Sequence, residues 1–87
     1  MNIAFRKSFQ KDAEKLPAAV KRDLAALIDT FTRASKLSDI PDCKKMTGFK
    51  NAWRIRLGNY RVGFFFENDI AEFVRVLNRK EIYRYFP

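Results

Sequence analysis

The first half of the chain carries apolar residues at helical spacing. The most regular series marks one face of a helix that we expect to begin at Pro17, and its members are Val20, Leu24, Leu27, Ile28, Phe31 and Ala34. A shorter helix should precede it, with Ser8 as its N-cap and with Phe9, Ala13 and Leu16 facing inward. Residues 2–7 can form a short strand before that helix.

The second half alternates between apolar and polar residues, which is typical of strands. An irregular segment, from about Ser38 to Asn51, comes first, because Pro41 and Gly48 interrupt any regular pattern there. Three strands are then expected, from Ala52 to Leu57, from Tyr60 to Glu67 and from Ile70 to Arg79. Gly58-Asn59 and Asn68-Asp69 have the composition of two-residue hairpin turns between them.

These elements predict an α+β fold. We expect a small, mostly antiparallel β-sheet of about four strands, with the element order β-α-α-β-β-β. The two N-terminal helices should pack on one face of the sheet and leave the other face open. A chain of 87 residues, 47% of them apolar, has enough core-forming side chains for a single domain over residues 1–87 and no room for a second.

The net charge of the chain predicts the kind of partner that it binds. The 18 basic and 10 acidic residues give a net charge of +8, which favours a polyanion, above all a nucleic acid. With no histidine and a single cysteine, Cys43, the chain lacks a metal-ligand set or an internal disulfide, so we expect no metal or other cofactor and a reduced, cytoplasmic setting. No apolar run approaches the roughly 20 residues of a membrane span, so no membrane partner is expected.

The predicted hairpin at Gly58-Asn59 gathers arginines on one face. In its register Arg56 faces Arg61 and Arg54 faces Gly63, and opposed like charges cost on the order of 0.2–1 kcal/mol. Guanidinium groups bind phosphate oxygens in pairs of hydrogen bonds, so the three arginines predict an anion site. Gly63 would leave space beside Arg54 for a nucleic-acid backbone or base to approach. The alternative is a solvated sheet face on which long arginine stems cover apolar surface.

Cations and aromatic rings alternate again from Arg79 to Pro87, as on surfaces that stack bases and bind phosphates. The same residues would equally suit a chain end held down by Ile82, Tyr85 and Phe86. Further candidates for RNA binding are Lys44, Lys45, Lys50, Lys80 and Arg84. Cys43 has no histidine partner, so we expect a partly buried structural cysteine rather than a catalytic thiol.

Three segments, in this order, resemble the RelE/ParE superfamily of bacterial toxins: Lys45-Met46-Thr47-Gly48, Trp53 to Val62, and Val76 to Tyr83. The resemblance implies the toxin of a type II toxin–antitoxin system. In the RelE branch such a toxin enters the ribosomal A site and cleaves messenger RNA there, with the 2′-hydroxyl as nucleophile and without a metal. It implies five site residues here: Arg54 and Arg56 on the first hairpin strand, Arg61 as phosphate clamp, Arg79 near the leaving group, and Tyr83.

Two details qualify the resemblance. The best-known member has lysines where this chain has Arg54 and Arg56, and arginine does not release its proton in a useful pH range, so Tyr83 is the candidate for proton transfer at the 2′-hydroxyl. A two-residue turn at Asn68-Asp69 would pair Arg61 with Val76 and send Arg79 to the opposite face, unless a bulge intervenes or the strand ends earlier.

The expected partners are the ribosome, messenger RNA and an acidic antitoxin, with operator DNA bound only through the antitoxin. Two other functions stay open. One is a ParE-like inhibitor of DNA gyrase without nuclease activity. The other is a non-catalytic RNA-binding domain, whose binding would depend strongly on salt.

Overall fold

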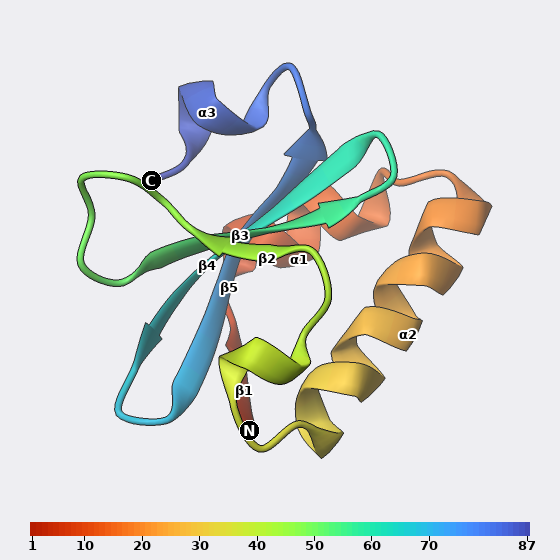
Figure 1. Ribbon diagram of the computed structural model, residues 1–87. Helices are drawn as coiled ribbons and strands as arrows, with labels where there is room; N and C mark the ends of the chain where they lie inside the picture. The colour runs from red at the N-terminus through yellow and green to blue at the C-terminus, as the bar shows by residue number, and fades with distance from the viewer.

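A five-stranded sheet forms the centre of the molecule (Figure 1). The computed structural model describes residues 1–87, and its elements are β1 (Asn2–Phe5), α1 (Lys7–Glu14), α2 (Ala18–Arg33), the 3₁₀ turn η1 (Leu37–Asp39), β2 (Cys43–Lys45), β3 (Ala52–Leu57), β4 (Tyr60–Glu67), β5 (Ile70–Asn78) and α3 (Ile82–Tyr85). The strand order is β1-β5-β4-β3-β2, with β1 parallel to β5 and the other pairs antiparallel. The predicted α+β fold is confirmed, with five strands in place of about four.

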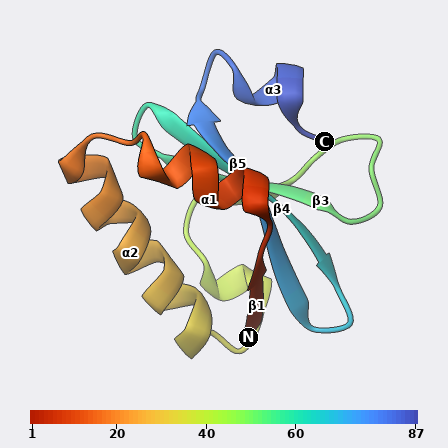
Figure 2. The same cartoon turned by 180° about the vertical axis from the view of Figure 1, so that it is seen from behind.

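Helices α1 and α2 cover one face of the sheet, and Figure 2 shows α1 in front of the strands. The main core lies between these layers and contains buried residues from both helices and from three strands: Phe9, Leu16, Leu24, Leu27, Phe31, Ile40, Ile55, Val62, Phe64, Ala71, Phe73 and Val76. Phe31, Phe64 and Phe73 are fully buried and meet edge to face or tilted, with ring centroids 5.0 to 5.7 Å apart. The alternating pattern of the strands thus buries one set of side chains under the helices.

The sequence predicts that the opposite face is open, but α3 covers part of it. Ile82 and Phe86 are buried there against Ala52 and Val74, in a second and smaller apolar cluster. The prediction that the C-terminal residues pack on the core is therefore confirmed for Ile82 and Phe86. It is wrong for Tyr85, which is 52% exposed.

The start of α1 differs from the expectation. The helix begins at Lys7, with Arg6 as N-cap, so Ser8 is not the cap. The Ser8 hydroxyl instead donates a 2.6 Å hydrogen bond to the carbonyl of Val74 on β5. Pro17 likewise precedes α2 as its N-cap and does not occupy the first helical position. The start of α1 thus lies two residues before the expected position, and the start of α2 one residue after it.

The segment expected to be irregular contains a strand. Residues Cys43–Lys45 pair antiparallel with β3 and form the edge of the sheet, with Lys44 opposite Arg54. Three residues are too few for a periodic pattern, so only the pairing with β3 reveals this strand. No helix of the chain has the length and apolar character that a membrane crossing requires.

Candidate functional site

The β3–β4 hairpin gathers three arginines on the sheet face that carries α3. Arg56 is the cross-strand partner of Arg61, and Arg54 is the partner of Gly63. Gly58 has a φ of +60° in the turn, a conformation that glycine adopts without the strain of a side chain. The register predicted from the Gly58-Asn59 turn is therefore confirmed, and with it the opposed arginine pair.

Arg79 joins two of these arginines in one depression. Arg56, Gly58, Asn59, Arg61 and Arg79 line a hollow of about 350 Å³. The backbone N–H of Arg79 donates a 2.8 Å hydrogen bond to the Asn59 carbonyl, which fixes the chain after β5 to the tip of the hairpin. We call this hollow the arginine depression.

A bulge explains why Arg79 reaches this place. The register between β4 and β5 shifts at Gly63 and Phe64, so that Arg61 pairs with Leu77 rather than Val76. β5 also ends at Asn78, one residue before the predicted boundary. The one-residue shift returns the end of β5 to the correct face, since side chains alternate along a strand.

No carboxylate neutralises the arginine depression. The ion pairs of the chain join Arg6 to Glu72, Arg33 to Asp29, Arg75 to Asp12 and Arg84 to Glu81. The guanidinium of Arg61 donates hydrogen bonds of 2.8 and 2.9 Å to the carbonyls of Gly58 and Tyr60, which orient it without cancelling its charge. The fold therefore leaves the charges of Arg56, Arg61 and Arg79 available to an anion.

Arg54 and Tyr83 meet in a second, neighbouring depression. Its volume is about 270 Å³, and its lining residues are Lys44, Lys45, Met46, Thr47, Arg54 and Tyr83. Tyr83 is 57% exposed and sits on the single turn of α3. We call this hollow the tyrosine depression. The five residues implied by the family resemblance thus divide between two hollows, three in the first and two in the second.

Of the predicted RNA-binding residues, two line a depression and three do not. Lys44 and Lys45 lie in the tyrosine depression. Lys50, Lys80 and Arg84 are exposed and line neither depression, and Arg84 lies 3.8 Å from the carboxylate of Glu81. A nucleic acid seated in both hollows would therefore engage the first two most directly.

The structure tests two further expectations, the space beside Gly63 and the reactivity of Cys43. Gly63 offers no room for RNA, because the ring of Phe86 lies so close that a Cβ at this position would collide with it. Burial raises the pKa of the half-buried Cys43 thiol to about 11, although Arg54 lowers it. The thiol is therefore a poor nucleophile, as expected of a structural cysteine.

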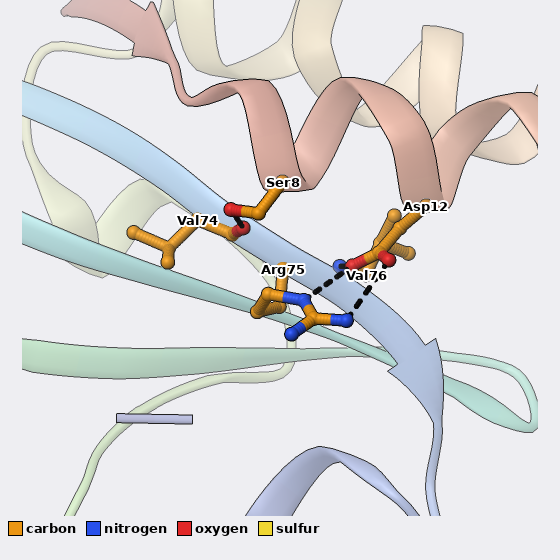
Figure 3. Close-up of polar contacts among 5 residues, drawn as sticks. All are labelled: Ser8, Asp12, Val74, Arg75 and Val76. Carbon is orange, nitrogen blue, oxygen red and sulfur yellow. Dashed lines mark hydrogen bonds and ion pairs between the residues drawn. The ribbon is translucent and has the colours of Figure 1, made fainter. Parts of the chain in front are cut away.

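One contact near the site was not predicted. Asp12 is 9% exposed, and its carboxylate accepts hydrogen bonds of 2.7 and 3.0 Å from the guanidinium of Arg75 and one of 3.2 Å from the backbone N–H of Val76 (Figure 3). The signal was present in the sequence, because Asp12 lies among the inward residues of α1, where a carboxylate needs a partner.

No group of three or more side chains is arranged to hold a metal ion.

Comparisons with known proteins identify the family of this chain. A family model for the ParE toxin of the type II toxin–antitoxin system parDE matches residues 3–83. Toxin RelE3 of Methanocaldococcus jannaschii is 40% identical over 88 residues, which cover 100% of both chains.

Solved structures of toxin–antitoxin complexes are also similar to this chain. A chain of the RelB-RelE antitoxin–toxin complex from Methanococcus jannaschii matches with a TM-score of 0.84 and 38% identity, covering 97% of this chain and 99% of that one. A chain of the archaeal RelE-RelB complex from Pyrococcus horikoshii matches with a TM-score of 0.73 and 21% identity, covering 93% and 97%. The second likeness concerns the fold alone.

Proposed function

Because the chain belongs to the RelE/ParE family of toxins from type II toxin–antitoxin systems, we propose that it is a ribosome-dependent endoribonuclease that cleaves messenger RNA in the A site and so stops translation. One observation carries the proposal. Arg56, Arg61 and Arg79 line a single depression, and none of them is bonded to a carboxylate. A binding protein with no phosphate to stabilise would have little reason to hold three like charges together.

The reaction is the attack of a 2′-hydroxyl on the neighbouring phosphate. The 2′-oxygen loses its proton and forms a bond to phosphorus while the bond from phosphorus to the 5′-oxygen of the next nucleotide breaks. The 5′-oxygen takes up a proton, so the products are a 2′,3′-cyclic phosphate and a 5′-hydroxyl. Negative charge accumulates on the phosphorane oxygens during this exchange. The guanidinium groups that line the arginine depression would stabilise that charge, which is the main contribution that a protein makes to phosphoryl transfer.

The tyrosine depression supplies the second part of the proposed site. Tyr83 is the candidate for proton transfer at the 2′-hydroxyl, since its phenol is exposed and shares a hollow with Arg54. Lys44 and Lys45 extend the positive charge along the RNA backbone. Two residues of one strand on the same face are about 6.6 Å apart, so Arg54 and Arg56 join the two hollows along β3.

We propose that an acidic antitoxin controls the toxin by covering these arginines. The relatives from M. jannaschii and P. horikoshii were crystallised as RelB-RelE complexes. The net charge of +8 favours an acidic partner, and the uncompensated arginines are where such a partner gains most. The same complex would bind operator DNA through the antitoxin.

The test is to mix the purified chain with ribosomes programmed with a defined messenger and to map the 5′ ends of the products. We expect cuts in the A-site codon that require ribosomes and carry a 2′,3′-cyclic phosphate. Arg61→Ala should abolish them, whereas Arg22→Gln, which removes one exposed charge from α2, should not. Intact messenger beside an active control toxin would overturn the proposal.

A second function is favoured by the matched family model, which describes the ParE toxin. A ParE-like protein would inhibit DNA gyrase by binding it and would cleave no RNA. A supercoiling assay with the purified chain separates the two functions. Inhibition of gyrase together with intact messenger would favour this alternative.

A further inference from the structure

Tyr83 belongs to α3, a helix that is too short to be stable on its own. α3 has four residues, and a single helical turn is unstable without tertiary contacts. Ile82 and Phe86 anchor one side of it by burial in the smaller apolar cluster. Tyr85 lies next to this buried face, and its half-exposed ring has a partner of its own.

That partner is Arg75. The centre of its guanidinium lies 5.4 Å from the centroid of the Tyr85 ring, within the range of a cation–π contact. A free arginine side chain would spend little time in that one position, because it has many rotamers. The contact therefore depends on whatever fixes the guanidinium.

Asp12 fixes it from the other side of β5. Its two carboxylate oxygens accept bonds from Nε and one terminal nitrogen of Arg75, so the plane of the guanidinium is set (Figure 3). The backbone N–H of Val76 holds the carboxylate in turn. The hydrogen bonds with Asp12 raise the pKa of Arg75, because they favour the charged form of the guanidinium.

We propose that Asp12, Arg75 and Tyr85 are positioning residues that hold Tyr83 over the tyrosine depression by tying α3 to α1. The inference rests on the proposed nuclease function. None of the three residues lines either depression, so each acts on the reaction only through Tyr83.

The central test uses Tyr85, because its side chain is exposed and its replacement should leave the fold intact. Tyr85→Leu keeps the bulk but removes the ring face, and Tyr85→Phe keeps the ring. We expect Tyr85→Leu to slow single-turnover cleavage on ribosomes about tenfold or more at unchanged affinity for the ribosome, since small misplacements of a reacting group have effects of that size. Tyr85→Phe should restore the rate.

A double variant separates positioning from general damage. In a Tyr83→Phe background the Tyr85→Leu change should slow cleavage by less than about twofold, because the group it positions has lost its function. Independent, multiplying losses in the double variant would overturn the proposal. Unchanged cleavage by Tyr85→Leu, in a chain whose parent is active, would overturn it as well.

Amide hydrogen exchange gives a result that needs no activity. Residues 82–86 should exchange faster in Tyr85→Leu and in Arg75→Met than in the parent, while β3 and β4 stay protected. If the parent cleaves no RNA, the proposed function fails. Equal exchange of residues 82–86 in parent and variants would show separately that the tie between α1 and α3 does not exist.

Discussion

Arg56 and Arg61 are direct cross-strand partners at the tip of the β3–β4 hairpin, and no carboxylate is bonded to either guanidinium. Two like charges in this position lower the stability of the fold on the order of 0.2–1 kcal/mol. This arrangement supports the proposal that the pair binds an anion, and neutralising one partner tests it.

Neutralising Arg56 should separate activity from stability. In Arg56→Gln we expect cleavage on ribosomes to fall about 100-fold, because one fixed charge at the phosphorane is lost. The free energy of unfolding should stay equal or rise by up to about 1 kcal/mol, since the repulsion with Arg61 is relieved. Urea denaturation and the cleavage assay measure the two effects. Arg22→Gln is the control for the loss of one charge elsewhere, and a drop in stability in Arg56→Gln alone would contradict the interpretation.

The salt dependence of RNA binding should show which residues of the two depressions contact phosphates. For a single-stranded RNA, each lost phosphate contact reduces the slope of log K against log salt concentration by about 0.7. We expect such a reduction in Arg79→Gln and in Lys44→Gln, which line the depressions. Lys50→Gln should leave the slope nearly unchanged, because Lys50 lines neither hollow. A single common slope for all three variants would argue for diffuse charge instead of two defined sites.

Gly63 should tolerate no side chain. In Gly63→Ala the added Cβ would meet the ring of Phe86, which is buried and cannot move aside freely. We expect a loss of about 1–3 kcal/mol in the free energy of unfolding, as in other overpacked cores. Displacement of Phe86 should also loosen α3 and slow cleavage. Thermal unfolding provides the measurement, and a chain as stable as the parent would show that Phe86 leaves more room than its position indicates.

The Cys43 thiol should resist alkylation. Its pKa is raised to about 11 by burial, so at pH 8 it carries about 100-fold less thiolate than an ordinary cysteine and should react with iodoacetamide about that much more slowly. The rate should climb as the pH approaches 11. Because the folded pKa lies above the unfolded one, the stability linked to this thiol is complete below the unfolded pKa and is lost as the pH rises through about 11. A Cys43→Ala chain should lack that loss, and rapid alkylation of the parent at pH 8 would contradict the burial.

The ion pair between Asp12 and Arg75 should be costly to break. Asp12→Asn leaves a charged guanidinium without its carboxylate, and we expect a loss of about 3 kcal/mol in the free energy of unfolding. Replacing both partners, as Asp12→Leu with Arg75→Met, should recover most of that loss. Urea denaturation of the single and double variants decides the point. Equal losses in both would mean that packing, and not the charge, determines the effect.

The hairpin arginines could be placed from the sequence alone. Gly58-Asn59 fixes a two-residue turn, and alternation along the strands then determines that Arg54, Arg56 and Arg61 share a face. Asn68 and Asp69 both adopt positive φ values, as the second turn requires. Local chemistry is sufficient in these cases, because the turn residues determine the register.

Other features depend on contacts between distant residues. The bulge opposite Gly63 and Phe64 brings Arg79 to the correct face, and no local signal in β5 marks it. The strand Cys43–Lys45 exists because β3 offers it a partner. Phe86 fills the space beside Gly63 from more than twenty positions away in the chain, so the sequence suggested an opening where there is none.

The parallel pairing of β1 with β5 also determines when the sheet can be completed during synthesis of the chain. β5 lies between β1 and β4, so β1 cannot join the sheet until residues 70–78 have been made. Contacts between such distant segments form late and slowly. Because Arg79 follows β5 in the chain, the arginine depression also forms only after that strand has been made.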